Sequence, residues 1–281
     1  MSYDLFLKSE SATLTTDDFE SYFSARPHYT LNSSQAFYEN EDTGVYFSFD
    51  YAPDEMGTVA FNLNYYRPHF SGLEAAPEVG AFVAAFNLTI DDPQTDGMGD
   101  GPFSVDGFIR GWNAGNRFGY RAILSRDDRP ATQVYPTTEL ERIWRWNLNR
   151  SALQNRMGET LFVPKFMFFK GKTQARSAVV WPDACPIFMP KADIVIVLRD
   201  ELSSSTDREV TVVEWPEIQS VVKAFPIDEE LGHFRLDYEA TPASVVRFIR
   251  ALPIVPQEPD SGLAYDSVLN AELVLENTTA G

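Results

Sequence analysis

Residues 58–65 read Thr58-Val59-Ala60-Phe61-Asn62-Leu63-Asn64-Tyr65, and in this stretch large apolar residues alternate strictly with small or polar ones. Successive side chains of a strand point to opposite faces, so the alternation predicts a strand with one face in a core and the other toward solvent. Half-buried strands of this kind are typical of antiparallel sheets. Residues 52–57 precede it and are expected to connect it to a second strand, residues 45–51, in a hairpin or meander.

Further elements are expected on both sides of this strand. Short strands are predicted at 3–8 and 35–40, with a short helix between them whose cap is Thr15 or Thr16. Downstream, one helix is expected to begin near Pro77 and a second to cover about residues 104–124. The second helix carries glycines every four residues on one face, a spacing that lets another part of the chain approach closely: Gly111, Gly115 and Gly119.

The second half of the sequence is richer in predicted strands. The candidates are residues 161–170, 175–181, 193–199, 209–215 and 233–239, with a last strand expected within 263–276. Thr138 and Glu141 have the spacing of a capping box and predict the start of a helix that ends at Gly158. Two more helices are expected to open with a proline, at Trp215-Pro216 and at Thr241-Pro242.

These elements together predict an α+β fold of two lobes, each a mainly antiparallel sheet packed with helices. Residues 127–136 are polar and contain proline, so they are expected to link the lobes. The sequence therefore predicts an acidic N-terminal lobe, residues 1–127, and a C-terminal lobe, residues 128–281.

The charge is strongly negative and unevenly distributed. The net charge is −18, and residues 1–106 carry 18 acidic but only 3 basic residues, whereas residues 107–178 carry 5 acidic and 13 basic ones. A surface of this sign repels nucleic acid and attracts basic proteins, whose association it accelerates by long-range steering. An acidic surface that serves only solubility is the alternative reading. Pairing of the basic middle with the acidic flanks inside the fold is equally compatible with the sequence.

The sequence also points to a compartment. The N-terminus lacks the basic start and the apolar run of a signal peptide, and no stretch approaches the ~20 apolar residues of a membrane helix. A single cysteine, Cys185, excludes an intramolecular disulfide and fits a reducing environment. A cytoplasmic protein without a membrane partner is therefore expected.

No arrangement of residues in the sequence predicts catalysis. The three histidines stand outside any metal-binding or triad motif, and Cys185 has no basic neighbour in sequence. The glycine-rich loop at residues 96–101 lacks the Gly-Lys-Ser/Thr ending of a phosphate loop, and as a calcium loop it places Phe103 where a bidentate glutamate is needed. We therefore expect no catalytic residue, no metal, no cofactor and no nucleic-acid partner, and a function in binding.

Exposed acidic loops are the expected contact sites for a partner. The longest runs over residues 91–101 between two predicted helices, and loops of that length are uncommon unless they are functional or disordered. The candidate partner-binding residues are Asp91, Asp92, Asp96 and Asp100, then Glu39, Glu41 and Asp42, and last Asp228, Glu229 and Glu230. Solvated loop charges with no partner are the alternative for each of them.

Two parts of the sequence resemble known proteins. The opening Met1-Ser2-Tyr3-Asp4-Leu5-Phe6-Leu7 is similar to the first strand of many small bacterial proteins of toxin–immunity loci. Residues 162–169 (FVPKFMFF), 179–183 (VVWPD) and 186–193 (PIFMPKAD) resemble immunity proteins encoded beside type VI secretion effectors, of the TsiT-like kind. The resemblance implies a cytoplasmic protein that binds and neutralises a nuclease-type toxin without a cofactor.

Two other functions stay open from the sequence. One is a non-catalytic adaptor or scaffold of a secretion or phage-like assembly. The other is an enzyme that uses a metal bound by carboxylates, because 41 acidic residues offer many pairs and no spacing singles one out.

Overall fold

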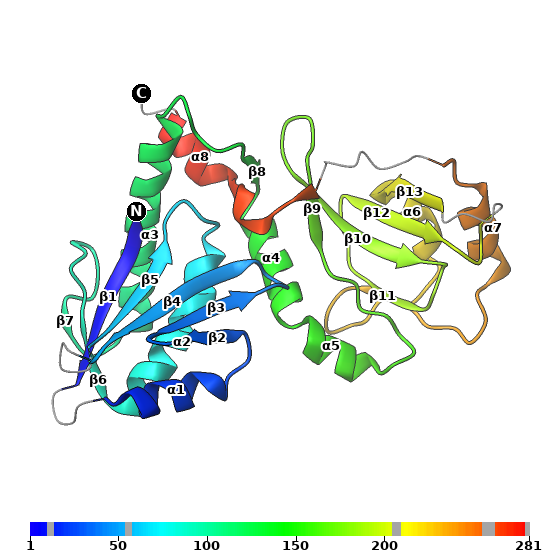
Figure 1. The fold of residues 1–281 in the computed structure, drawn as a ribbon. Coiled ribbons are helices and arrows are strands. Elements are labelled where there is room, and N and C mark those ends of the chain that lie inside the picture. Colours follow the sequence, from blue (N-terminus) through cyan, green and yellow to red (C-terminus); the bar gives the residue numbers. More distant parts are fainter. Residues whose placement is uncertain (10–13, 54–57, 204–208, 255–261, 279–281) are drawn as a thin grey trace. The chain divides into compact units, whose positions relative to one another are not determined.

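The structure is a computed structural model that describes residues 1–9, 14–53, 58–203, 209–254 and 262–278 (Figure 1). The α+β fold is confirmed, with a large antiparallel sheet and a second, mixed sheet. The chain divides into two compact units. Unit 1 consists of Met1–Glu141 together with Tyr265–Gly281, and unit 2 of Arg142–Ala264.

This division differs from the lobes expected at 1–127 and 128–281. The expected linker contains strand β8 (Gln133–Tyr135), which pairs in parallel with β16 (Val268–Asn270) from the end of the chain. Those backbone hydrogen bonds join the two segments to each other, and both segments belong to unit 1. The chain therefore leaves unit 1 within helix α4 (Thr137–Leu148) and returns to it before β16.

Unit 1 is built on a seven-stranded sheet in the order β2-β3-β4-β5-β1-β6-β7, in which every neighbouring pair is antiparallel. The strands are β1 (Ser2–Ser9), β2 (Tyr29–Asn32), β3 (Gln35–Asn40), β4 (Val45–Ala52), β5 (Thr58–Asn64), β6 (Leu88–Asp91) and β7 (Asp100–Gly101). The alternating stretch forms β5, with Val59, Phe61 and Leu63 fully buried, so the strand predicted from it is confirmed.

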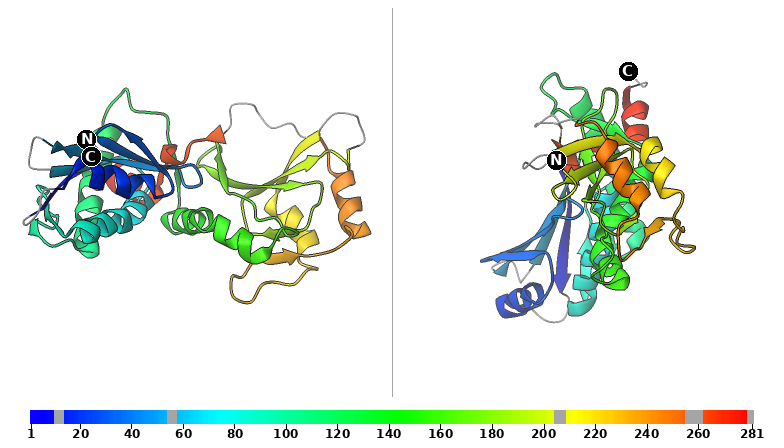
Figure 2. Two further views of the ribbon diagram at one scale, coloured as in Figure 1. Left: turned by 60° about the horizontal axis from the view of Figure 1, so that its bottom comes forward. Right: turned by 90° about the vertical axis from the view of Figure 1, so that its right-hand side faces the viewer.

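One face of this sheet packs against helices α1 (Thr16–Ser24), α2 (Phe70–Phe86) and α3 (Val105–Leu124), as both views in Figure 2 show. Their rings pack against the strands: Phe19 of α1 stacks on Tyr51, and Phe108 of α3 meets Tyr3 edge-on. The glycine face of α3 also lies here, where a Cβ at Gly115 would overlap the Tyr65 hydroxyl. The predicted close approach is confirmed.

Unit 2 contains a five-stranded sheet in the order β13-β12-β10-β9-β15. Its strands are β9 (Met167–Phe169), β10 (Arg176–Pro182), β12 (Ile194–Arg199), β13 (Glu209–Glu214) and β15 (Gly262–Leu263). Only the β10–β12 pair is parallel, and the apolar run at 194–198 forms β12, an internal strand between β13 and β10. The remaining elements are β11 (Ile187–Met189), β14 (Phe234–Leu236), α5 (Arg150–Met157), α6 (Trp215–Val222) and α7 (Ala243–Ala251).

Three predicted elements differ from the structure, each because of contacts distant in sequence. Helix α2 begins at Phe70 and includes Pro77, since burial of its first turns outweighs the backbone hydrogen bond that proline removes. Helix α4 begins at Thr137, where the Glu272 carboxylate accepts from the Thr137 amide at 3.0 Å, so the Thr138 capping box is wrong. The strand expected within 263–276 is the short β16, and the rest of that range from Ala271 onward belongs to helix α8 (Ala271–Thr278), which packs on a cluster around Tyr120.

Candidate partner-binding site

The negative charge belongs almost entirely to unit 1. By sequence, unit 1 holds 25 acidic and 8 basic residues, a net charge of −17, whereas unit 2 holds 16 acidic and 15 basic residues, a net charge of −1. The basic middle of the sequence is thus shared between the units, and the basic residues of unit 2 as a whole nearly balance its acidic ones. Long-range attraction of a basic partner is therefore a property of unit 1.

Within unit 1, carboxylates gather on the sheet face opposite the helices. In β1, Tyr3, Leu5 and Leu7 point into the core, so Asp4, Phe6 and Lys8 point the other way. We define the acidic sheet face as the side chains on this side of the five strands β3, β4, β5, β1 and β6. Its charged members are Asp4, Glu39, Asp50 and Asp91, with Lys8 as the single base among the described residues.

Hydrogen bonds between neighbouring strands hold these carboxylates in place. Asp4 accepts from the Asn62 Nδ2 at 2.5 Å, and Asp50 accepts from the Gln35 Nε2 at 2.5 Å. Asp91 pairs with the Lys8 ammonium at 2.5 Å, while Glu39 is exposed. Side chains fixed in this way lose little conformational entropy when a cationic partner docks on them.

Three aromatic rings interrupt the polar surface. Phe37 and Tyr46 lie side by side on the same face, with ring centroids 6.3 Å apart, and Phe6 is 38% exposed. Aromatic groups within a polar patch are the usual strong contacts of protein interfaces. The face therefore combines charge for attraction with rings for contact area.

The loop predicted to be a flexible acidic segment is held in place from within. Asp92 is 5% exposed, and its carboxylate accepts hydrogen bonds from the Tyr3 hydroxyl and from the backbone amides of Gln94 and Met98. Arg110 of α3 donates to the carbonyl oxygens of Asp96 and Gly97. Asp92, predicted to be an exposed contact residue, is therefore buried, and its carboxylate organises the loop.

The other carboxylates of unit 1 in the prediction border the acidic sheet face. Asp96 and Asp100 are exposed, as is Glu41, and Asp42 is half-buried. The turn at 41–44 and the loop after Asp91 lie off the same end of the sheet, because the strands that lead into them run the same way. Strands β4 and β6 are separated by β5 and β1. Three spacings between adjacent strands place them about 14 Å apart.

The third predicted group belongs to unit 2 and does not form an acidic surface. The Glu230 carboxylate pairs with the Arg156 guanidinium at 2.5 Å, and Asp228 accepts from the backbone amides of Glu230 and Leu231. Glu229 is exposed. These residues belong to a different unit from the other seven, so the ten predicted residues are not one site.

Sequence reasoning missed Asp4 and Asp50 as members of the face. Both occupy outward positions in strands that the alternation predicts, so reading the polar residues of each strand as a set identifies them. The prediction concentrated on loops and overlooked strand positions.

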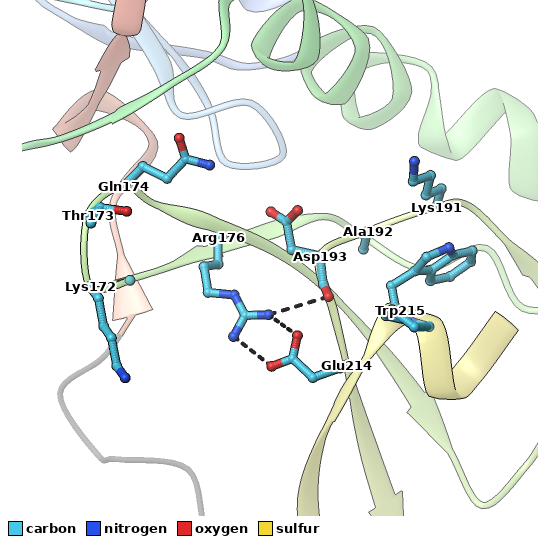
Figure 3. Close-up of a pocket in the computed structure, with 11 residues that line it drawn as sticks. Lys172, Thr173, Gln174, Arg176, Lys191, Ala192, Asp193, Glu214 and Trp215 are labelled. Atoms are coloured by element: carbon cyan, nitrogen blue, oxygen red, sulfur yellow. Dashed lines mark hydrogen bonds and ion pairs between the residues drawn. The ribbon is translucent and has the colours of Figure 1, made fainter.

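The described part of unit 2 offers no catalytic pair in its pocket next to β10 and β12 (Figure 3). Arg176 is clamped by both carboxylate oxygens of Glu214, at 2.9 and 2.5 Å. The Asp193 carboxylate accepts from the Ser177 amide at 2.8 Å and from the Ser177 hydroxyl at 3.0 Å. Both carboxylates are thus engaged within the sheet: Glu214 links β13 to β10 across β12, and Asp193 links the start of β12 to β10.

Burial shifts the pKa values of two groups of types that often take part in catalysis. Burial raises the pKa of the Cys185 thiol to about 11, far above that of a reactive thiolate. Burial, with a contribution from the Arg142 charge, lowers the pKa of His233 to about 4. Among the described residues, no three histidine, cysteine, aspartate or glutamate side chains lie together as metal ligands would.

Comparison with known proteins gives no match. No protein-family model fits the sequence, and neither curated proteins nor solved structures include a similar one. Across the described helices, none combines the length and apolar character required to span a bilayer.

Proposed function

We propose that this protein is an immunity-type inhibitor that binds a basic protein toxin, a nuclease-type effector, with the acidic sheet face of unit 1. The observation that carries the proposal is the separation of charge, −17 on unit 1 against −1 on unit 2. The resemblance of short segments to type VI immunity proteins suggests the class of partner. The charge distribution suggests which surface of the protein binds it.

The inhibition is steric and electrostatic. A nuclease binds nucleic acid through basic groups that contact phosphates. Carboxylates on four of five adjacent strands present several negative charges to such a surface, and a protein docked there excludes the substrate. No chemical step by the inhibitor is required.

Electrostatic capture has a measurable signature. Steering by unpaired surface charge raises association rates well above the neutral range, and salt screens it over a distance of about 8 Å at physiological ionic strength. Raising the salt concentration therefore slows association strongly and changes dissociation much less.

The test is binding of the full chain to the product of the gene adjacent to its own, followed by biolayer interferometry across a salt series. We expect a stable complex whose association rate falls steeply with salt. The variant E39K/D96K/D100K replaces three exposed carboxylates in and beside the acidic sheet face. It is expected to slow association by about tenfold or more.

A matched control variant changes the net charge by the same amount, but its substitutions lie in unit 2. The variant E201K/E229K/E239K also replaces three exposed carboxylates, so it separates the local surface from the total charge. Equal slowing by both variants overturns the sheet face as the contact. Absence of any complex at micromolar concentrations overturns the proposed function.

A further inference from the structure

Unit 2 contains a second pocket, in which arginines surround an apolar interior. It lies between helices α4–α5 and the segment at 231–233, and its volume is about 420 Å³. Its lining residues, which we call the arginine pocket, are Arg142, Arg145, Trp146, Asn149, Ala152, Leu153, Arg156, Leu231 and His233. All of them belong to unit 2. The volume is within the range of small-ligand sites.

The charged groups of the pocket have one sign. Its lining includes three guanidinium groups, and none of the described lining residues is acidic. Glu230, outside the lining, pairs with Arg156. Arg142 is held in place, because its Nη2 donates to the Lys191 carbonyl at 3.1 Å and its guanidinium lies 5.1 Å from the centre of the Phe166 ring.

The inner wall is flat, apolar and rigid. The Trp146 ring stacks on Phe188, with centroids 5.7 Å apart at an angle of 16°, and meets the His233 ring edge-on at 4.9 Å. The Trp146 Nε1 donates to the Pro164 carbonyl at 2.7 Å, so the only polar atom of the indole is already bonded. His233 is neutral at pH 7 because of its lowered pKa.

A further part of the wall is fixed by Asp228, one of the candidate partner-binding residues. The Asp228 amide donates to the His233 carbonyl at 2.8 Å, and the Asp228 carboxylate accepts from the Leu231 amide at 2.9 Å. These bonds set the positions of Leu231 and His233. The pocket is thus formed before any ligand enters it.

We propose that the arginine pocket binds a small organic anion that joins a flat apolar ring system to a carboxylate or phosphate. Guanidinium groups form charge-assisted, often bidentate hydrogen bonds with such anions. The indole, leucine and alanine side chains match the ring system, which loses its contact with water on binding.

This site is independent of the proposed toxin-binding function, because it lies in the other unit and has the opposite charge. The probe is 2-naphthoate, titrated into the full chain by calorimetry, with neutral 2-naphthamide and inorganic phosphate as paired ligands. We expect one site for 2-naphthoate with a dissociation constant at or below about 1 mM, and binding at least about tenfold weaker for the amide and for phosphate.

Two tryptophan variants on α5 locate the site. Ala152 is exposed and lines the pocket, so A152W fills it and is expected to abolish binding. Asn155 is exposed on the same helix and lies outside the lining, so N155W is expected to bind as the parent chain does. Thermal unfolding of both variants checks that they fold.

Three results contradict the proposal. They are equal affinity for naphthoate and naphthamide, unchanged binding by a folded A152W, and no heat of binding for 2-naphthoate in the parent chain. The variant R145Q/R156Q tests the role of charge. Loss of two guanidinium groups is expected to weaken the binding of 2-naphthoate by about tenfold and to leave the binding of 2-naphthamide unchanged.

Discussion

The Tyr3 hydroxyl donates a hydrogen bond to the Asp92 carboxylate across 2.9 Å, although 89 positions separate the two residues in the chain. The bond links β1 to the loop that follows β6. Burial, reinforced by the Asp92 charge, raises the pKa of Tyr3 far above its usual range, so the phenol stays protonated as the donor at every ordinary pH.

Replacing Asp92 is therefore expected to destabilise unit 1. D92A leaves the Tyr3 hydroxyl and the Met98 amide without their acceptor, at a cost of about 2–3 kcal/mol in the free energy of unfolding. Urea denaturation measures this loss. D96A removes an exposed carboxylate of the same loop and is expected to change stability by less than about 0.5 kcal/mol. Equal effects of the two substitutions contradict the structural role of Asp92.

Asn270 is expected to be the residue on which the attachment of the C-terminal segment depends. It is fully buried, and its side chain accepts from the His69 amide at 2.9 Å and donates to the Thr137 hydroxyl at 3.0 Å. N270A leaves these groups unsatisfied and is expected to cost about 2–4 kcal/mol in unfolding free energy.

The control for this substitution lies on the same C-terminal segment. Glu276 forms an exposed ion pair with Arg117 at 3.5 Å, and such pairs add little. E276A is expected to leave the denaturation midpoint almost unchanged. If N270A also leaves the denaturation midpoint almost unchanged, β16 and α8 do not contribute to the stability of unit 1. That result would contradict the contacts seen in the structure.

Replacing Gly115 by alanine is expected to have the opposite effect on stability from the same replacement at an ordinary helix glycine. In an exposed helix, Gly→Ala stabilises by about 1 kcal/mol, but here the new Cβ overlaps the Tyr65 ring. G115A is expected to lower the melting temperature, and N113A, at an exposed position of the same helix, is not. Adding Y65A removes the overlap, so the double-mutant cycle is expected to show strong coupling.

His233 is expected to make the protein less stable as the pH is lowered. The folded protein protonates this ring only near pH 4, because burial lowers its pKa, whereas the unfolded chain does so near 6.5. Between those values the unfolded state binds the extra proton, so the free energy of unfolding falls as the pH is lowered. H233Q is expected to remove this part of the dependence, measured as a flatter curve of unfolding free energy against pH. Parallel curves for the two proteins would falsify the assignment.

Cys185 is expected to react slowly. With a pKa of about 11 instead of 9.0, the thiolate fraction at neutral pH is about a hundredfold lower than in an unperturbed thiol. Iodoacetamide labelling of the folded protein is expected to be slower by about that factor than labelling in urea. Rapid labelling of the native protein contradicts the raised pKa of this half-buried thiol.

The sequence by itself determined the local elements. Alternation at 58–65 and the apolar run at 194–198 are patterns of burial within one strand, and both strands and their core faces follow from them. The same periodicity in β1 and β4 contains the outward carboxylates Asp4 and Asp50, so most of the acidic sheet face was also readable in advance.

Only the tertiary structure decided which distant residues meet. The pairing of β8 with β16 placed the end of the chain in unit 1, the Tyr3 hydroxyl turned Asp92 from an expected contact residue into a buried acceptor, and the 231–233 segment closed the arginine pocket against α4–α5. Each outcome depends on partners tens to more than a hundred residues apart. Periodicity shows which face of a helix or strand is buried. It does not identify the distant residues that pack against that face.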